Sequence, residues 1–325
     1  MFKLLVLYPA HSEDLAILEH ILGMNVKIYL KEDLEQELLK EILPQIEILL
    51  VGSGRRITRN LIKNARNLKM IQTLAAGVDL IPWNIIPKDV IVCSNAGGNA
   101  RAVAEHALAL LLSAIKKITY HTEKMRSGIW KRTQENKMFS DKIVGIIGFG
   151  HIGKEIAKLL KPLGFKVYGI NRRGKTDIKI DFIGSVQDLD SVLRLSDVII
   201  IALPLTKRTR GLIDKEKLEL MKKDAILINI SRGPVIVEKD LFDHLKNNPT
   251  FIAALDVWWK YPERKDSICY QNYPFHTLEN IIMTPHIAGF SSEIRKYVIE
   301  HAAENIARFV KGQKPINIVD RRLYL

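Results

Sequence analysis

The stretch that decides the fold is Ile143-Val144-Gly145-Ile146-Ile147-Gly148-Phe149-Gly150-His151-Ile152-Gly153-Lys154. Its apolar first half predicts a buried parallel strand, and the amphipathic residues after it predict a helix. Three glycines at the G-x-G-x-x-G spacing join the two: Gly148 permits a tight turn, Gly150 lets phosphates approach the backbone, and Gly153 lets the helix pack on the strand. The helix N-terminus adds free N–H groups and partial positive charge. The stretch therefore predicts a dinucleotide site, to which His151 and Ile152 contribute.

Glycine turns between a strand and a helix also occur for packing reasons alone. Here an apolar run precedes the turn and an amphipathic helix follows it, as the dinucleotide pattern requires. This context favours the binding site over the packing turn.

The bulk composition indicates a globular protein of two domains. Its 325 residues, 47% of them hydrophobic, suffice for two substantial cores. No apolar run approaches the roughly 18 residues of a membrane span, and the N-terminal run lacks a small-residue cleavage site, so we expect neither a membrane anchor nor a signal peptide. The two cysteines, Cys93 and Cys269, argue against a disulfide framework, and Cys93 falls in a core-like strand. We therefore expect a cytoplasmic protein.

The net charge of +13 is compatible with several kinds of partner. Nucleic acid, an acidic membrane surface and anionic small molecules would all be attracted. The basic residues are scattered, however, with no run of five and no interleaved aromatic residues for base stacking. A lysine-rich surface, or a field that steers an anionic substrate and cofactor, is favoured over nucleic-acid binding.

The first 95 or so residues alternate strands and helices. The expected strands lie at 3–9, 26–30, 46–51, 70–75 and 90–93, and the expected helices at 12–22 with Ser12 as cap, 34–43 and 58–67. Alternation of this kind gives a parallel sheet flanked by helices. The glycine and asparagine residues at 95–99 predict a domain boundary.

A second alternating series follows, after a long apolar helix at 100–119 and a charged surface loop at 126–136. Its expected strands lie at 143–148, 166–170, 198–203, 225–230, 253–257 and 281–283, with helices ending at 163 and spanning 189–195 and 238–246. A final helix at 291–310, capped by Ser291 or Ser292, should pack back on the first domain. We therefore predict an α/β protein of two Rossmann-like, doubly wound parallel-sheet domains: a cofactor domain at 99–288 inserted into a flavodoxin-like substrate domain at 1–98 and 289–325.

The end of the second strand of the cofactor domain decides the cofactor. Where a carboxylate would bind the ribose hydroxyls, 18 positions past Gly153, the chain has Asn171 followed by Arg172 and Arg173. A carboxylate repels a 2′-phosphate, whereas a neutral amide beside two guanidinium groups attracts one. The sequence therefore favours NADP(H), with NAD(H) still possible. The two arginines could also be ordinary loop residues.

Five ordered motifs extend the pattern beyond the glycine turn: Leu-Pro-Leu-Thr at 203–206 with Thr-Arg-Gly-Leu-Ile at 209–213, Ile-Asn-Ile-Ser-Arg-Gly at 228–233, Ala-Leu-Asp-Val at 254–257, Thr-Pro-His-Ile-Ala-Gly at 284–289 and Ala-Ala-Gly-Val-Asp at 75–79. With the run at 99–105, they make the chain resemble the D-isomer-specific 2-hydroxyacid dehydrogenases over nearly its whole length. The resemblance implies NAD(P)-dependent reduction of a 2-oxo acid, or the reverse oxidation of a D-2-hydroxy acid. It also implies a homodimer with a two-domain cleft, in which the helix at 100–119 is a plausible dimer surface. The cofactor contacts that it implies are Leu203, Pro204, Thr209, Ile230, Ser231, Asp256 and Gly289.

The chemistry of a 2-oxo acid agrees with the residues present. Reduction needs a hydride donor, a proton for the developing alkoxide, and cationic or N–H groups for the carboxylate. Arg232, after an apolar strand, can bind carboxylate and carbonyl oxygen together, although alone it could cap a helix. His286 can donate the proton, although a lone histidine is often structural. The resemblance favours the catalytic role for both. The small-residue turn at Ala76, Gly77 and Val78 exposes successive N–H groups for the substrate carboxylate.

One departure from the family pattern concerns the partner of His286. The family has a glutamate five residues after the counterpart of Asp256, and this chain has Tyr261 there. A phenol orients an imidazole but does not stabilise its cation by charge, so we expect proton donation to fail at a lower pH than with a carboxylate partner. Glu263 could take over if the loop is shifted, and formate-oxidising relatives carry glutamine near this position. We favour an active reductase. The alternative is a nucleotide-sensing binding protein that has lost catalysis.

An aromatic cluster follows the same strand: Trp258, Trp259, Tyr261, Tyr270, Tyr273 and Phe275. It reads most simply as a packed loop or a subunit contact, and otherwise as an apolar wall that restricts the substrate side chain. The sequence does not choose among glyoxylate, hydroxypyruvate, phosphohydroxypyruvate and larger 2-oxo acids. No metal site is expected. The glycine-rich regulatory domains that end some phosphoglycerate-forming relatives are not expected either, since the chain stops at Leu325.

Overall fold

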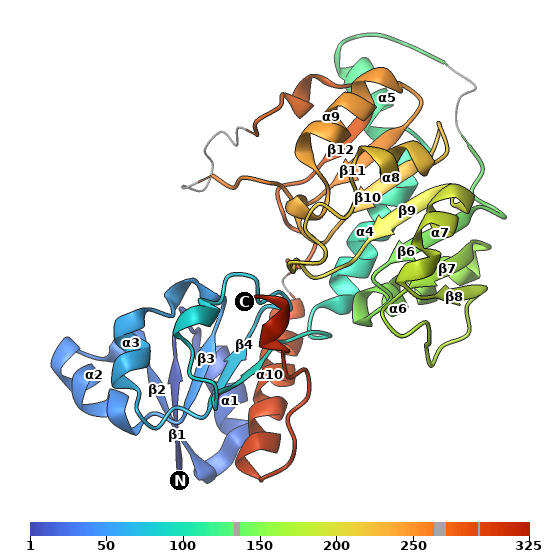
Figure 1. The fold of residues 1–325 in the computed structure, drawn as a ribbon. Coiled ribbons are helices and arrows are strands. Elements are labelled where there is room, and N and C mark those ends of the chain that lie inside the picture. Colours follow the sequence, from blue (N-terminus) through green and yellow to red (C-terminus); the bar gives the residue numbers. More distant parts are fainter. Residues whose placement is uncertain (133–136, 263–270, 292) are drawn as a thin grey trace. The chain divides into compact units, whose positions relative to one another are not determined.

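The computed structural model describes residues 1–132, 137–262, 271–291 and 293–325. It divides into two compact units (Figure 1). The split unit comprises Met1–Asn99 and Phe290–Leu325, and the inserted unit comprises Ala100–Gly289. The chain thus leaves the first unit, completes the second, and returns.

The split unit contains a five-stranded parallel sheet in the order β2-β1-β3-β4-β5, which is the flavodoxin-like order. Its strands are β1 (Phe2–Val6), β2 (Val26–Leu30), β3 (Ile48–Val51), β4 (Met70–Thr73) and β5 (Ile91–Cys93). Successive side chains point to opposite faces, so Leu4 and Val6 join one core while Leu5 and Leu7 join the other. Both faces of this sheet are therefore buried, which explains its nearly continuous apolar strands.

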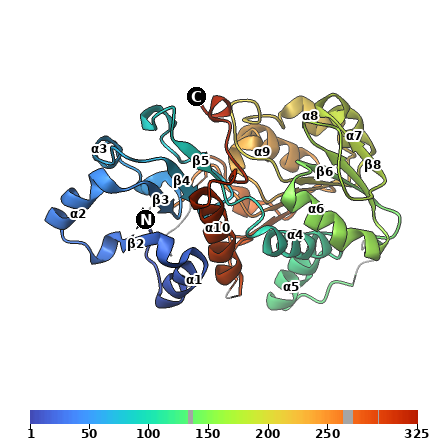
Figure 2. The same ribbon diagram turned by 90° about the horizontal axis from the view of Figure 1, so that it is seen from below.

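Helices cover the two faces of this sheet. One face packs against α1 (Ser12–Leu22) and α10 (Ile294–Val310), which lie side by side in Figure 2, and the other against α2 (Gln36–Ile42) and α3 (Arg59–Asn64). Arg295 of α10 donates from Nε and Nη2 to the two carboxylate oxygens of the buried Asp14 of α1. The last helix therefore packs back on the first part of the chain, as expected from the sequence.

The inserted unit contains a seven-stranded parallel sheet in the order β12-β11-β10-β9-β6-β7-β8. Its strands are β6 (Ile143–Ile147), β7 (Lys166–Ile170), β8 (Phe182–Gly184), β9 (Val198–Ile201), β10 (Ile226–Asn229), β11 (Ile252–Leu255) and β12 (Ile281–Met283). Helices α4 (Ala100–Ile115) and α6 (His151–Leu160) cover one face, and α7 (Leu189–Leu195), α8 (Lys215–Leu220) and α9 (Glu238–Asn247) cover the other (Figure 1). The strand order reverses between β6 and β9, which is where ligands bind in sheets of this kind. The prediction of two doubly wound α/β units is confirmed.

Several predicted elements were wrong in detail. The expected helix at 100–119 breaks at Lys117, whose φ of 50° lies in the left-handed region, and α5 (Ile118–Arg126) starts there. Helix α1 begins at Ser12 but its cap is His11, whose amide donates to Asp14 (3.1 Å). The cap residue of α10 is Glu293, while Ser291 accepts from the Ile294 amide (3.2 Å). Ser292, the other predicted cap, lies outside the described residues.

The apolar face of α4 packs within its own unit. Eight of its side chains are buried there: Ala100, Val103, Ala104, Ala107, Leu110, Leu111, Ala114 and Ile115. A dimer contact cannot use that face without unfolding the unit. In the described residues, no helix is both long and apolar enough to cross a membrane.

Candidate functional site

The inserted unit brings most of the predicted site residues to one edge of its sheet. All of its strands are parallel, so their carboxyl ends lie at the same edge. The glycine turn follows β6, Asn171 follows β7, Leu203 follows β9, Arg232 follows β10 and His286 follows β12. In an open α/β sheet this edge, outside the switch point, is where ligands bind.

The glycine turn has the geometry that a dinucleotide site requires. Gly148 has φ of 107°, and a side chain there would place a Cβ only 2.4 Å from the Ala202 carbonyl oxygen. A Cβ on Gly153 would lie 2.9 Å from the Gly148 carbonyl oxygen, so glycine is needed for the helix to pack this closely. At Gly150, by contrast, no described residue other than its chain neighbours has an atom within 4 Å of the position of a Cβ. That open position lies beside the amides of the first turn of α6, which have no helical acceptors. The residues fit a bound pyrophosphate.

The loop after β7 is held by the amide of Asn171. Its Nδ2 donates to the carbonyls of Phe149 (3.3 Å) and Lys175 (2.9 Å), and its Oδ1 accepts from the Arg173 amide (2.9 Å). Arg172 and Arg173 are both exposed next to this strand end. The asparagine thus shapes the loop and ties it to the glycine turn at Phe149, while Arg172 and Arg173 are exposed.

The loops after β9 and β10 use their polar side chains to fix their own backbone. Thr209 Oγ1 donates to the Pro204 carbonyl (2.6 Å) and accepts from the Thr206 amide (2.8 Å). Leu203 is half-buried and Pro204 is exposed at the start of this loop. The hydroxyl of Thr209, predicted as a cofactor contact, therefore already closes a turn.

The turn that carries Arg232 is tied to the strand end by Asn229. This buried amide accepts from the Ser231 amide (3.1 Å) and hydroxyl (2.8 Å), and its Nδ2 donates to the Arg232 carbonyl (3.0 Å). Ile230, like Ser231, is buried. The Arg232 guanidinium donates to the Ser231 carbonyl (2.7 Å), and its side chain is half-buried. Arg232 thus places a positive charge, fixed by this hydrogen bond, at the carboxyl edge of the sheet.

The same turn packs tightly on the strand end after β11. A Cβ on Gly233 would lie 2.3 Å from the Trp258 carbonyl carbon. Glycine is therefore required at position 233. At this point the turn that carries Arg232 contacts the backbone of Trp258, which leads into the loop of Tyr261.

The Asp256 carboxylate holds the turn on which His286 lies. Asp256 is fully buried, and its oxygens accept from Thr284 Oγ1 (2.7 Å), the Ile287 amide (2.9 Å) and the Ala288 amide (3.0 Å). His286 has φ of 58°, a conformation that costs free energy for any residue with a side chain. Two of the amides that follow it donate to one carboxylate, and these hydrogen bonds offset the cost. Both oxygens of Asp256, predicted as a cofactor contact, thus have partners in the protein. Gly289, also predicted as a contact, is half-buried at the end of this segment.

Tyr261 lies against His286, as the sequence pattern suggests. The two ring centroids are 5.3 Å apart, with the planes 37° from parallel. The Trp258 amide donates to the Tyr261 hydroxyl (3.2 Å), which fixes the phenol by the backbone. A tyrosine therefore occupies the place beside the imidazole. Glu263, the other predicted partner, lies outside the described residues.

The aromatic cluster is a packed loop. Trp259 stacks on Phe275 with centroids 5.3 Å apart and planes 8° apart, and the buried Trp258 forms a T-shaped pair with Phe275. Tyr273 packs on the same apolar core, and Tyr270 lies outside the described residues. These rings pack within the inserted unit, and the role of the cluster as an apolar wall for the substrate stays a prediction.

The split unit supplies the predicted anion-binding turn. It follows β4, at the carboxyl edge of the five-stranded sheet. Within the described part of the chain, the amides of Ala76, Gly77 and Val78 donate no hydrogen bond to the protein. Ala76 and Gly77 are half-buried, so these amides sit where a carboxylate could bind them.

Sequence reasoning missed His106 of α4. Its Nε2 lies 3.1 Å from Thr284 Oγ1 and 3.5 Å from an Asp256 carboxylate oxygen, so it extends the network under the His286 turn. The one available signal was a histidine within a long apolar helix. That signal does not identify its partners, which lie more than 140 residues away along the chain.

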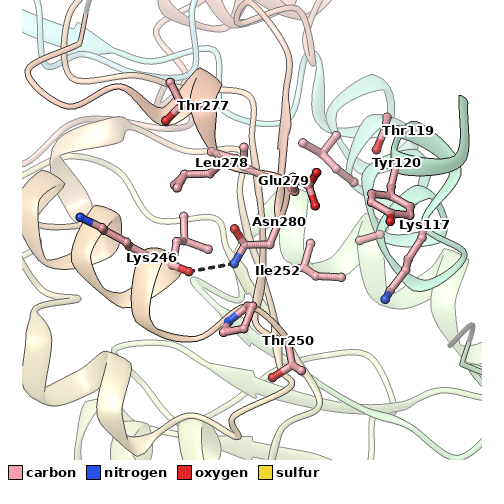
Figure 3. Close-up of a pocket in the computed structure, with 15 residues that line it drawn as sticks. Lys117, Thr119, Tyr120, Lys246, Thr250, Ile252, Thr277, Leu278, Glu279 and Asn280 are labelled. Atoms are coloured by element: carbon pink, nitrogen blue, oxygen red, sulfur yellow. Dashed lines mark hydrogen bonds between the residues drawn. The ribbon is translucent and has the colours of Figure 1, made fainter. Parts of the chain in front are cut away.

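A cavity of about 340 Å³ lies at the opposite edge of the inserted unit. Its lining includes the first residues of β11 and β12 and the last residues of α9. Figure 3 shows Lys117, Tyr120, Lys246 and Asn280 around the cavity. The Asn280 side-chain amide donates to the Leu245 carbonyl (3.0 Å), and both residues line the cavity (Figure 3). Because ligands of such sheets bind at the carboxyl ends, this cavity is not the candidate active site. The described residues include no group of three or more potential metal ligands.

Comparisons with known proteins agree with this geometry. The sequence model of the D-isomer specific 2-hydroxyacid dehydrogenase NAD binding domain matches residues 108–288. The D-3-phosphoglycerate dehydrogenase of Methanocaldococcus jannaschii is 32% identical over 98% of this chain and 60% of its own length. The glyoxylate reductase of Pyrococcus furiosus is 32% identical over 92% of this chain and 90% of its own length.

A solved structure, the D-isomer specific 2-hydroxyacid dehydrogenase of Xanthobacter autotrophicus Py2 in complex with NADPH and MES, is similar throughout. It has 26% identity and a TM-score of 0.80, with 100% of this chain and 99% of that chain covered. This chain spans about 60% of the length of the two D-3-phosphoglycerate dehydrogenases that it matches. The motifs, the fold and these matches agree, and the chain belongs to the D-isomer-specific 2-hydroxyacid dehydrogenase family.

Proposed function

We propose that this protein is an oxidoreductase that transfers a hydride between NADP(H) and a small 2-oxo acid or D-2-hydroxy acid. The observation that carries the proposal is the shared carboxyl edge of the inserted unit. Three strands of one parallel sheet end there in functional groups: the glycine turn, the Arg232 guanidinium, which donates a hydrogen bond to the Ser231 carbonyl, and the His286 imidazole. Activity, substrate and cofactor preference are all parts of this proposal.

Each protein group has a distinct task in the proposed reaction. A bound nicotinamide cofactor supplies the hydride. Arg232 binds the carboxylate and the carbonyl oxygen of the substrate, so that negative charge developing on the oxygen is stabilised. His286 donates a proton to that oxygen in reduction and removes it in oxidation. The amides of Ala76, Gly77 and Val78 bind the substrate carboxylate.

The remaining residues hold the cofactor and the catalytic turn. His151 and Ile152 begin α6 and offer amides to the phosphates, while Leu203 and Ile230 give apolar contact. Asp256 holds the turn of His286 from beneath.

The proposed preference for NADP(H) rests on the strand end after β7. Among the residues after this strand, Asn171 takes the place of a carboxylate, and its side chain is used to shape the loop. Arg172 and Arg173 are exposed next to it and can bind a 2′-phosphate bidentately. The structure of a relative in complex with NADPH is compatible with this preference.

A panel of 2-oxo acids with both reduced cofactors tests the proposal. We expect oxidation of NADPH with glyoxylate or hydroxypyruvate, and a kcat/KM for NADPH above that for NADH. His286→Ala should lower kcat about 100-fold to 10,000-fold, which is the usual contribution of a general acid. It should also abolish one ionisation in the pH profile of kcat/KM. If every ionisation in the pH profile of kcat/KM persists in this variant, His286 is not the general acid.

The second candidate is a nucleotide-sensing binding protein of the same fold. The tyrosine against His286 favours it, since the family glutamate is replaced by a neutral group. Calorimetric binding of NADPH without turnover of any 2-oxo acid would support this candidate over the reductase.

We further propose a cytoplasmic homodimer that binds neither nucleic acid nor membranes. Apolar side chains gather on α5 and just after it: Ile118, Met125, Ile129 and Trp130 are 54%, 53%, 48% and 80% exposed. A second copy would cover such a patch. We expect a dimer by light scattering that Trp130→Glu converts to a monomer, and a monomeric wild type would contradict this assignment.

A further inference from the structure

The 316–324 segment of the split unit adds an antiparallel neighbour to the edge strand β5. Ile318 pairs with Cys93 in an isolated bridge, and the Val319 amide donates to the Val92 carbonyl (2.9 Å). The segment is therefore fixed beside the sheet rather than lying loosely on it.

Two side chains of this segment hold the loop that follows the predicted anion-binding turn. The Tyr324 ring stacks on Trp83, with centroids 5.2 Å and planes 18° apart. Arg321 Nη2 donates to the carbonyls of Trp83 (3.0 Å) and Ile86 (2.8 Å), and its Nη1 donates to the Pro87 carbonyl (3.1 Å). A guanidinium that donates to three carbonyls fixes the backbone of the loop, and the stacked ring fixes the indole.

Trp83 in turn contacts the anion-binding turn itself. The indole is buried, and its Nε1 donates to the Val78 carbonyl (3.1 Å), which also accepts from the Ile81 amide (3.2 Å). The Val78 carbonyl lies one α-carbon away from the Val78 amide, so anchoring the carbonyl leaves only the two dihedrals of Val78 by which that amide can change direction. The path from Tyr324 to Val78 therefore consists of one ring stack and one hydrogen bond.

We propose that Tyr324 and Arg321 are positioning residues for substrate binding: through Trp83 they hold the Ala76–Val78 turn with its amides aimed at the substrate carboxylate. This inference rests on the proposed function, because it takes that turn as the carboxylate site. Within the described residues these amides donate to no protein acceptor, so no hydrogen bond of their own fixes their direction. A site that is already ordered loses less entropy when the anion binds.

Substitutions at both ends of this path test the proposal. Tyr324→Ala should raise KM for the 2-oxo acid about fivefold, in proportion to the free energy of a stacked aromatic pair, with kcat and the KM for NADPH within twofold. Tyr324→Phe keeps the ring and should behave as the wild type. Trp83→Phe keeps a ring but removes the indole donor, and should raise the same KM about fivefold. Tyr297→Ala removes a tyrosine that is 60% exposed on α10, and serves as the matched control.

Amide hydrogen exchange gives a second readout that does not depend on activity. Peptides spanning 76–83 should exchange faster in Tyr324→Ala and Trp83→Phe than in the wild type and the control. Unchanged exchange, or faster exchange with an unchanged KM for the 2-oxo acid, would overturn the positioning role. If the wild type reduces no 2-oxo acid, the proposed function fails, while the exchange experiment still decides whether Tyr324 orders the turn.

Discussion

The hydrogen bonds of Asp256 make a sharp prediction about the turn of His286. In Asp256→Asn, the remaining oxygen can still accept from Thr284 Oγ1 and the Ile287 amide. The new Nδ2 would face the Ala288 amide, so two hydrogen-bond donors would be buried against each other. Losing one hydrogen bond to a charged acceptor and leaving a buried donor unsatisfied should cost about 3 kcal/mol together.

That cost should appear both locally and globally. The amides of Ile287 and Ala288 should exchange about 100-fold faster, since each 1.4 kcal/mol of lost protection is worth a factor of ten. Thermal unfolding of the inserted unit should occur roughly 6–12 °C lower for a unit of this size. With its turn relaxed from the left-handed conformation, His286 should also be misplaced, so kcat/KM should fall.

A matched control separates burial from charge. Asp243→Asn makes the same change at an exposed ion pair with Lys239 on α9, and should alter stability by less than about 0.5 kcal/mol. If Asp256→Asn unfolds at the same temperature as this control, with Ile287 and Ala288 as protected as in the wild type, then the carboxylate does not hold the turn and the reasoning is wrong.

Three further predictions concern the cofactor, the acid and the pH dependence of stability. Arg172→Ala combined with Arg173→Ala should lower kcat/KM for NADPH about tenfold to 100-fold and leave NADH within threefold, because only NADPH carries the 2′-phosphate; steady-state kinetics with both cofactors decide this. Tyr261→Glu should extend the reduction rate to higher pH by about one unit, since a carboxylate beside His286 favours the imidazolium; an unshifted profile would mean that the residue at 261 does not act on the imidazole. Burial lowers the pKa of His244 below its ordinary 6.5, although a nearby carboxylate acts in the opposite sense. The folded state therefore resists protonation there, and stability is lost as the pH falls below 6.5. His244→Leu should lose less stability than the wild type between pH 7.5 and 5.5 in urea titrations.

The sequence predicted best the elements that apolar residues and chain breakers delimit. Strands β2, β7 and β12 and helix α7 have the expected bounds, because apolar residues and clear breakers mark them. The strand β8 and the helices α5 and α8 were missed. The first is a three-residue, partly exposed strand, and the helices are charged segments with one buried residue at most, so no apolar stripe marks them.

The positions of the reactive groups were predictable for a different reason. In a parallel sheet the direction of every strand is the same, so a residue that follows an apolar strand must lie at the carboxyl edge. This is why Arg232, His286 and the glycine turn could be assigned to one edge without knowledge of any contact. The same argument does not predict the distance between two such groups, because this distance depends on the conformation of short loops. The tyrosine at 261 illustrates this limit, since its hydroxyl accepts from the Trp258 amide, a backbone contact that no motif in the sequence indicates.

The supporting network could not be predicted because most of its partners are backbone groups. Asp256 accepts from two amides that lie about 30 residues further along the chain, and the amide that a residue donates is the same for every residue type except proline. The pattern of side chains in the sequence therefore does not predict which backbone amides will donate to a buried carboxylate. The motif places Asp256 and His286 at neighbouring strand ends, but only the folded backbone shows that the first supports the conformation of the second. Reactive groups in such a sheet can thus be inferred from strand order, while the residues that hold them require coordinates.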